Sequence, residues 1–231
     1  MRRFSLLFLL GCLPGIAHAS AVVIWPVDPV IRAGEQASAL WLENKGGEPI
    51  TLQVRTLGWS QPDGEDRLDR QDAIVASPPI ATVAPGARQL VRIIRRVRGT
   101  APEASYRLVI DELPKPPDVG AAGAMQARLA VQMRYSVPLF ALTGPVGAPQ
   151  LDTRIVTHGA ARVLLIRNAG AAHARLTDLR LLDRGREIVV KAGLAGYVLP
   201  GATLALPLPA GQVGTVRVRV NGIDQVLGNQ A

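Results

Sequence analysis

Residues 124–142 read AMQARLAVQMRYSVPLFAL, and apolar and polar side chains alternate along them. The apolar side chains occupy the odd positions from 125 to 137: Met125, Ala127, Leu129, Val131, Met133, Tyr135 and Val137. The positions between them carry mostly polar residues: Gln126, Arg128, Gln132, Arg134 and Ser136. A period of two predicts a β-strand with one apolar and one polar face. At thirteen residues, 125–137, this strand is about twice the usual length of ~5–6 residues.

Two interpretations of this long strand stay open on the pattern alone. In the first, it is an ordinary strand that bridges two sheets or two domains. In the second, its odd-numbered apolar side chains, the apolar row, are lent to another protein, because an extended segment can complete a partner's sheet.

The beginning of the chain predicts export. A basic pair at Arg2 and Arg3 precedes an apolar run at 4–16, and Ala17-His18-Ala19 stands before Ser20. This order is typical of a signal peptide cleaved after residue 19. No second run of about 18 apolar residues follows, so we expect no membrane span.

Cys12 is the only cysteine of the chain. The segment Leu9-Leu10-Gly11-Cys12 loosely resembles a lipoprotein processing site, and a lipid-anchored Cys12 is the less favoured alternative to cleavage after Ala19. A chain cleaved after Ala19 keeps no cysteine, so we expect neither a disulfide nor a thiol nucleophile.

The chain is basic because of its arginines. Its formal net charge is +8, and removal of Arg2 and Arg3 leaves +6. A basic exported protein can meet nucleic acid, anionic lipid or acidic polypeptide. Export and the low aromatic content of 4% disfavour nucleic acid, which is bound in part by base stacking. Most arginines alternate with apolar residues, which indicates solvated strand faces.

Short β-type runs separated by turn sequences recur along the first part of the chain. The predicted strands span residues 21–25, 37–43, 51–59, 89–96, 106–111 and 128–142. Turn sequences rich in Gly, Pro, Asn and Asp lie at 32–35, 44–47, 62–64 and 84–86. About seven strands at this spacing, without an amphipathic helix, predict an immunoglobulin-like sandwich.

A second domain is predicted after the linker-like sequence at 143–149. Its strands are expected at residues 161–167, 175–182, 187–191, 203–208 and 214–221. The expected fold is therefore all-β, with one sandwich at 20–143 and a smaller one at about 150–231.

Patterns typical of enzymes and cofactor sites are missing from the sequence. The two histidines after the signal peptide, His158 and His173, have no acidic or cysteine neighbour at metal-ligand spacing. No phosphate-binding glycine motif occurs, and Asp111 and Glu112 are more typical of capping or ion pairing than of catalysis. We expect no enzyme, no metal and no cofactor.

Seven blocks of sequence, in this order, resemble the periplasmic PapD-like pilus chaperones, in particular their archaic branch, which serves Csu-type and spore-coat-U-type pili. These blocks are Trp25–Ile31, Ala39–Asn44, Ser77–Pro79, Pro85–Arg92, Tyr106–Pro114, Met133–Leu139 and Gly193–Gly201. The resemblance implies two immunoglobulin-like domains in an L shape, located in the periplasm. It also implies that the apolar row, Met125 to Val137, fills the groove of an incomplete pilus subunit, which is then delivered to an outer-membrane usher.

The resemblance further implies basic residues that anchor the C-terminal carboxylate of the subunit. Pap-type chaperones use an arginine in the first strand, where this chain has Pro29, and a lysine in the long strand. The expected anchors are Arg107 first, then Arg134 and Arg92, because an arginine binds a carboxylate through two parallel hydrogen bonds. The alternative role of these arginines is a surface ion pair, with Asp111 or Glu112 in the case of Arg107.

The sequence leaves open two alternatives to the chaperone function, and it leaves open whether a chaperone free of its subunit self-associates through its exposed strand. A structural pilus or adhesion protein of sandwich type would begin with an alternating extension, whereas residues 20–31 run directly into strand-like sequence. A carbohydrate-binding sandwich would expose aromatic platforms, whereas the aromatic residues here stand mostly in sequence contexts typical of strand cores.

Overall fold

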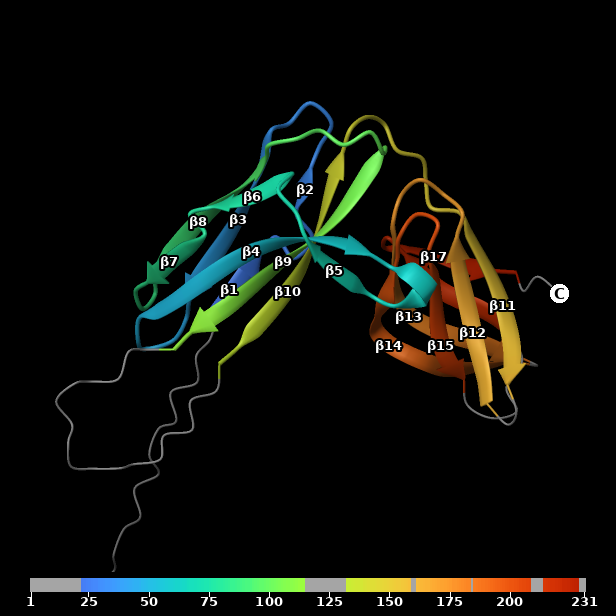
Figure 1. The fold of residues 1–231 in the computed structure, drawn as a ribbon. Coiled ribbons are helices and arrows are strands. Elements are labelled where there is room, and N and C mark those ends of the chain that lie inside the picture. The colour runs from blue at the N-terminus through green and yellow to red at the C-terminus, as the bar shows by residue number, and fades with distance from the viewer. Residues whose placement is uncertain (1–21, 115–131, 159–160, 184, 209–213, 229–231) are drawn as a thin grey trace, which may run out of the picture.

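A computed structural model describes residues 22–114, 132–158, 161–183, 185–208 and 214–228. The predicted signal peptide and four members of the apolar row, Met125, Ala127, Leu129 and Val131, lie outside the described residues. Within the described ranges the regular structure is β-strand, apart from the short 3-10 helix η1 (Pro62–Gly64). No helix in this part of the chain is long and apolar enough to cross a membrane. Two β-sandwich domains meet at an angle to form an L shape (Figure 1), which confirms the predicted fold class.

The first domain contains two facing sheets. Sheet A has the order β1 (Val22–Trp25), β3 (Ala37–Asn44), β8 (Arg88–Arg95) and β6 (Ile74–Ser77). Sheet B has the order β2 (Val30–Ile31), β10 (Arg134–Leu142), β9 (Glu103–Leu113), β4 (Ile50–Ser60) and β5 (Arg67–Arg70), and β7 (Ile80–Val83) also pairs with β4. The first strand therefore changes sheets between β1 and β2.

Alternation along the strands builds the core of this domain. Leu40 and Leu42 of β3 face Leu108 and Ile110 of β9 across the sandwich, and all four are fully buried. Burying each of these side chains contributes about 1.5–3 kcal/mol.

The outer face of sheet A carries two aromatic residues whose surrounding sequence is typical of a strand core. Trp25 and Trp41 are register partners on β1 and β3, and their rings stack with centroids 6.1 Å apart. Since Leu40 and Leu42 point inward, Trp41 points outward, and it is partly exposed. The guanidinium of Arg88 lies 5.4 Å from the Trp25 ring centroid. The core assignment was therefore wrong for these two residues, whereas Trp59 and Tyr197 are buried.

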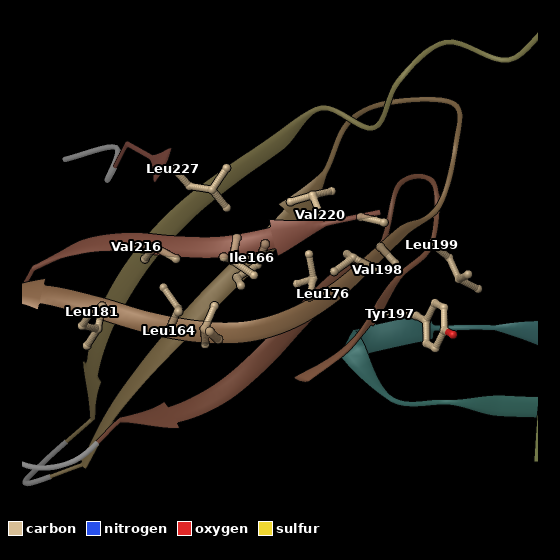
Figure 2. Close-up of a cluster of buried hydrophobic side chains, with 14 of the residues drawn as sticks. Leu164, Ile166, Leu176, Leu181, Tyr197, Val198, Leu199, Val216, Val220 and Leu227 are labelled. Atoms are coloured by element: carbon tan, nitrogen blue, oxygen red, sulfur yellow. The ribbon is translucent and has the colours of Figure 1, made fainter. Parts of the chain in front are cut away.

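The second domain also has two sheets. One contains β11 (Leu151–His158), β12 (Ala161–Asn168) and β15 (Thr203–Leu208). The other contains β14 (Arg186–Val198), β13 (Ala174–Asp183), β16 (Thr215–Val220) and β17 (Ile223–Leu227). Leu164, Ile166, Leu176, Leu181 and Val216 fill the space between them (Figure 2).

In each domain, one buried asparagine makes the same set of three hydrogen bonds to backbone groups, and we call this set the asparagine bracket. In the first domain, Asn44 Nδ2 donates hydrogen bonds to Glu48 O and Val83 O at 2.7 and 3.0 Å, and Gly46 N donates to Asn44 Oδ1 at 2.9 Å. In the second, Asn168 makes the same three bonds with Ala172 O, Val198 O and Gly170 N. Each asparagine is fully buried and joins a loop to a distant strand end. The two domains are therefore built on a common plan.

We expect Asn44→Ala to lower the free energy of unfolding by about 2–3 kcal/mol, because it leaves buried backbone groups without partners. Asn44→Asp keeps the acceptor for Gly46 N and loses the two donors, so it is the matched control and should be destabilising by a similar amount. Urea denaturation measures both. If Asn44→Ala lowered the free energy of unfolding by less than about 0.5 kcal/mol, the expectation would be contradicted, because water would then replace the hydrogen bonds of Asn44.

The domain junction is made by residues of both domains. Phe140 of β10 and Trp59 of β4 belong to the second domain's core cluster, and Tyr197 of that cluster lies beside the β4–β5 hairpin (Figure 2). The Phe140 ring stacks on that of His173 with centroids 3.3 Å apart. The Oε1 atom of buried Glu103 accepts a hydrogen bond from His173 N at 2.8 Å. The Oε2 atom of Glu103 pairs with His173 Nδ1 at 2.9 Å.

Gly64 lets the hairpin approach the second domain closely. It has φ +82°, and a Cβ atom there would lie 2.7 Å from Thr203 O. Both the backbone conformation and the contact therefore require glycine.

Candidate functional site

The outer face of sheet B carries most of the predicted site residues. Odd-numbered residues of β10 and even-numbered residues of β9 point into the sandwich, so Arg134 and Arg107 lie on the opposite, outer face. Arg134 is the register partner of Asp111, and Pro138 is that of Arg107. The two arginines thus lie on neighbouring strands of one sheet face, four positions apart along the ladder.

The outward edge of β10 is largely unpaired in the described structure. Of the described strands only β2 pairs on that side, and it reaches only Phe140 and Ala141. Phe140 N donates to Pro29 O at 3.3 Å, whereas Met133 O, at an odd position, accepts from Glu112 N of β9. Since hydrogen bonding alternates along an antiparallel strand, the backbone groups of Arg134 and Ser136 point away from β9. They form an edge to which another strand can be added.

Arg134 already takes part in an ion-pair network. Arg134 Nε and the Arg55 guanidinium both donate to the carboxylate of Asp111, the latter at 2.7 Å. Although burial raises the pKa of Asp111, these hydrogen bonds outweigh it and hold the pKa below its ordinary value. A shallow hollow of about 430 Å³ at this end of β10 is lined by these three residues together with Gln53, Glu112, Leu113, Pro114, Gln132 and Met133.

Arg107 occupies a more enclosed place at the domain junction. Its side chain is only 13% exposed, and its guanidinium lies 3.7 Å from the centroid of the Trp59 ring and 5.5 Å from that of Tyr197. Its ion-pair partner is Asp66, at 3.4 Å, whereas Asp111 pairs with Arg55 and Arg134. Burial lowers the pKa of Arg107, and Asp66 opposes this effect. An arginine stays charged under such conditions, so this is a semi-enclosed positive charge.

The third predicted anchor lies elsewhere. Arg92 stands on β8 opposite Ala39, between buried Val91 and Ile93, and is exposed on the outer face of sheet A. The sandwich therefore separates it from Arg107 and Arg134, and the structure does not bring the three together.

The three described members of the apolar row differ in exposure. Met133 is 41% exposed next to the free edge. Tyr135 is partly buried against the first domain's core, and Val137 is part of that core with 7% exposure. The row therefore passes from solvent into the sandwich between Met133 and Val137. Pro29 is buried beside this strand. It occupies the position at which Pap-type chaperones have the arginine of the first strand.

Comparison with known proteins identifies the chain. The family profile described as pili and flagellar-assembly chaperone, PapD N-terminal domain, matches residues 21–142, which is more than half of the chain. The chain belongs to this family of pilus-assembly chaperones. No curated protein sequence matches it significantly.

Solved structures agree with this assignment. A chain of the CsuC–CsuE chaperone–tip adhesion subunit pre-assembly complex, from archaic chaperone-usher Csu pili of Acinetobacter baumannii, is 27% identical. The match has a TM-score of 0.74 and covers 91% of this chaperone and 100% of that chain. The fold is shared with the Pseudomonas aeruginosa CupB2 chaperone (19% identity, TM-score 0.60, covering 89% of this chain and 100% of that chain). It is also shared with a chain of the Salmonella enterica SafA pilin–SafB chaperone complex (19% identity, TM-score 0.64, covering 90% of this chain and 93% of that chain). The chaperone is thus of the PapD-like type and its archaic branch.

Several residues of the site were not found from the sequence. Asp66 and Gln61 lie in the turn region around 62–64, which was recognised only as a turn. The pairing of His173 with Glu103 joins residues 70 positions apart, and no local pattern indicates it. In the described residues no group of three or more His, Cys, Asp or Glu side chains could hold a metal ion.

Proposed function

We propose that this chaperone binds an incomplete β-sandwich pilus subunit, of the spore-coat-U-like kind, by adding its own strand to the subunit's open sheet. In this proposal it works in the periplasm after cleavage of residues 1–19, delivers the subunit to an outer-membrane usher, and catalyses no covalent reaction. The observation that carries the proposal is the edge of β10, where the backbone groups of Arg134 and Ser136 point outward and Met133 is exposed. The similar Csu and Saf structures, which are chaperone–subunit complexes, support it.

The apolar row supplies the affinity in this proposal. Met125, Ala127, Leu129, Val131 and Met133 continue the alternation away from the core, whereas Tyr135 and Val137 connect the row to it. Four or five inserted side chains contribute about 6–15 kcal/mol before the costs of ordering. That is enough to hold a subunit whose own sheet is incomplete.

For the carboxylate anchor we propose Arg107 as the primary residue and Arg134 as the second. Arg107 is semi-enclosed, and charge-assisted hydrogen bonds are stronger when water is partly excluded. Arg134 and Asp111 stand at the end of the ladder where the added strand begins. Arg92, on the opposite face of the sandwich, is the weakest of the three candidates.

The free edge gives a direct test. Ser136 is at an even position, so Ser136→Pro removes an outward N–H and keeps the ladder to β9; Pro138 shows that this strand accepts proline. We expect Ser136→Pro to stay folded and to weaken binding of the pilus subunit about tenfold or more, because a ladder hydrogen bond is lost and the ring obstructs the edge. Ser136→Ala is the control and should bind like wild type. Measurement is by co-purification and titration with the refolded subunit, and equal binding by all three proteins would contradict strand addition at this edge.

A further inference from the structure

A hydrogen-bonded cluster connects Arg107 to the second domain. Its members are Trp59, Gln61, Asp66, Arg107 and Tyr197, and we call it the Arg107 cluster. The first three come from the end of β4 and the hairpin after it, Arg107 comes from β9, and Tyr197 comes from β14 of the second domain.

Asp66 is the shared acceptor of this cluster. Its Oδ1 accepts hydrogen bonds from Trp59 Nε1 and Gln61 Nε2, both at 2.9 Å. Its Oδ2 accepts from Arg107 Nη2 at 3.4 Å, well beyond the ~2.7–2.9 Å of a strong charge-assisted bond. Asp66 is held firmly on the Trp59 and Gln61 side and loosely on the Arg107 side.

Gln61 carries the connection across the domain junction. Its Nε2 also donates to Tyr197 O at 3.0 Å, and Leu199 N donates to its Oε1 at 2.9 Å. One side-chain amide thus binds two backbone groups of the second domain and the carboxylate that faces Arg107.

We propose that Asp66 occupies, in the free chaperone, the place on Arg107 that the C-terminal carboxylate of a bound subunit takes. The incoming carboxylate exchanges with Asp66, and because Asp66 also holds Trp59 and Gln61, occupancy of Arg107 is transmitted to the junction with the second domain. This rests on the proposed anchor role of Arg107 and adds a residue that sets the strength and selectivity of that anchor.

Two geometric facts favour exchange over a permanent ion pair. The Asp66 side chain is 51% exposed, so it can turn into water, where a carboxylate is well solvated. Arg107 has a second contact besides Asp66, because its guanidinium is stacked on the Trp59 ring, which is itself buried in a core cluster. Arg107 therefore keeps its position when Asp66 leaves, and its donors are already oriented for a second carboxylate.

The test uses a peptide with the C-terminal sequence of the cognate pilus subunit, made once as the free acid and once as the carboxamide. Wild type should prefer the acid. Asp66→Asn, which keeps an acceptor oxygen for Trp59 and Gln61 and removes the competing charge, should raise affinity for the acid about three- to tenfold and leave the amide unchanged. Asp69→Asn is the control, since Asp69 of the same hairpin pairs with Arg67 and should not affect binding.

A second readout follows the Trp59 indole N–H resonance, assigned through Trp59→Phe. We expect the acid peptide, but not the amide, to shift it in wild type, and the shift to be reduced in Asp66→Asn. Equal binding of acid and amide to wild type would overturn the anchor role of Arg107 itself. An acid preference that Asp66→Asn leaves unchanged would keep the anchor and overturn the exchange.

Discussion

Leu129→Arg is expected to abolish stable binding of the pilus subunit while the chaperone itself stays folded. Leu129 is the central one of the five row residues, Met125 to Met133, that the proposal inserts into the subunit, and its replacement removes about 1.5–3 kcal/mol of apolar burial. It also asks a charged group to enter an apolar groove, which costs several kcal/mol more. The combined effect is a loss of affinity of about 100-fold or more.

The matched control for this substitution is Gln126→Arg, which introduces the same side chain on the opposite face of the predicted strand. It should leave the complex intact. Co-expression with the subunit, followed by purification through a tag on the subunit, compares the two variants under identical conditions. Equal loss in both would indicate a general charge effect, and retention in both would contradict insertion of the row.

Phe140→Ala is expected to cause the largest loss of stability among substitutions at the domain junction. Phe140 belongs to a strand of the first domain, is 1% exposed and packs within the core cluster of the second. Its removal leaves a cavity next to Trp59, His173 and Tyr197. Such a change lowers the free energy of unfolding by about 3–5 kcal/mol.

Phe140→Leu separates packing from ring stacking. It keeps an apolar side chain, loses the stacked contact with His173, and should cost about 1 kcal/mol. Urea denaturation measures stability, and small-angle scattering measures whether the angle between the domains becomes variable in Phe140→Ala. If Phe140→Ala unfolded at the same urea concentration as wild type, the junction would not depend on this ring.

Strands with clear alternation could be predicted from the sequence. The runs at 37–43, 51–59, 89–96 and 106–111 correspond to β3, β4, β8 and β9, because each of these strands buries one face in the sandwich. Polar or short strands could not be predicted in this way. β5 reads RLDR and is exposed throughout, and β2 has only two residues. The strand expected at 187–191 is part of β14, which runs on to Val198 past Gly193 and Gly196, and this extension could not be predicted because glycine weakens the strand pattern of a sequence.

The candidate site was predictable only in part, for the same physical reason. The apolar row and the position of Arg107 on a strand follow from local periodicity. The partners of Arg107 do not, because Trp59, Asp66 and Tyr197 meet it only through sheet pairing and domain packing. Arg92 shares the strand context of Arg107, and only the sheet order shows that it faces the other way.

In the proposed complex, a strand of the subunit pairs with the outward edge of β10. Amide hydrogen exchange of Arg134 and Ser136, followed residue by residue in the free chaperone and in its complex with the subunit, measures this directly. We predict fast exchange at both amides in the free chaperone and strong protection in the complex, with Tyr135 and Val137 protected in both states by their bonds to β9. Unchanged fast exchange of Arg134 and Ser136 in a stable complex would contradict the account.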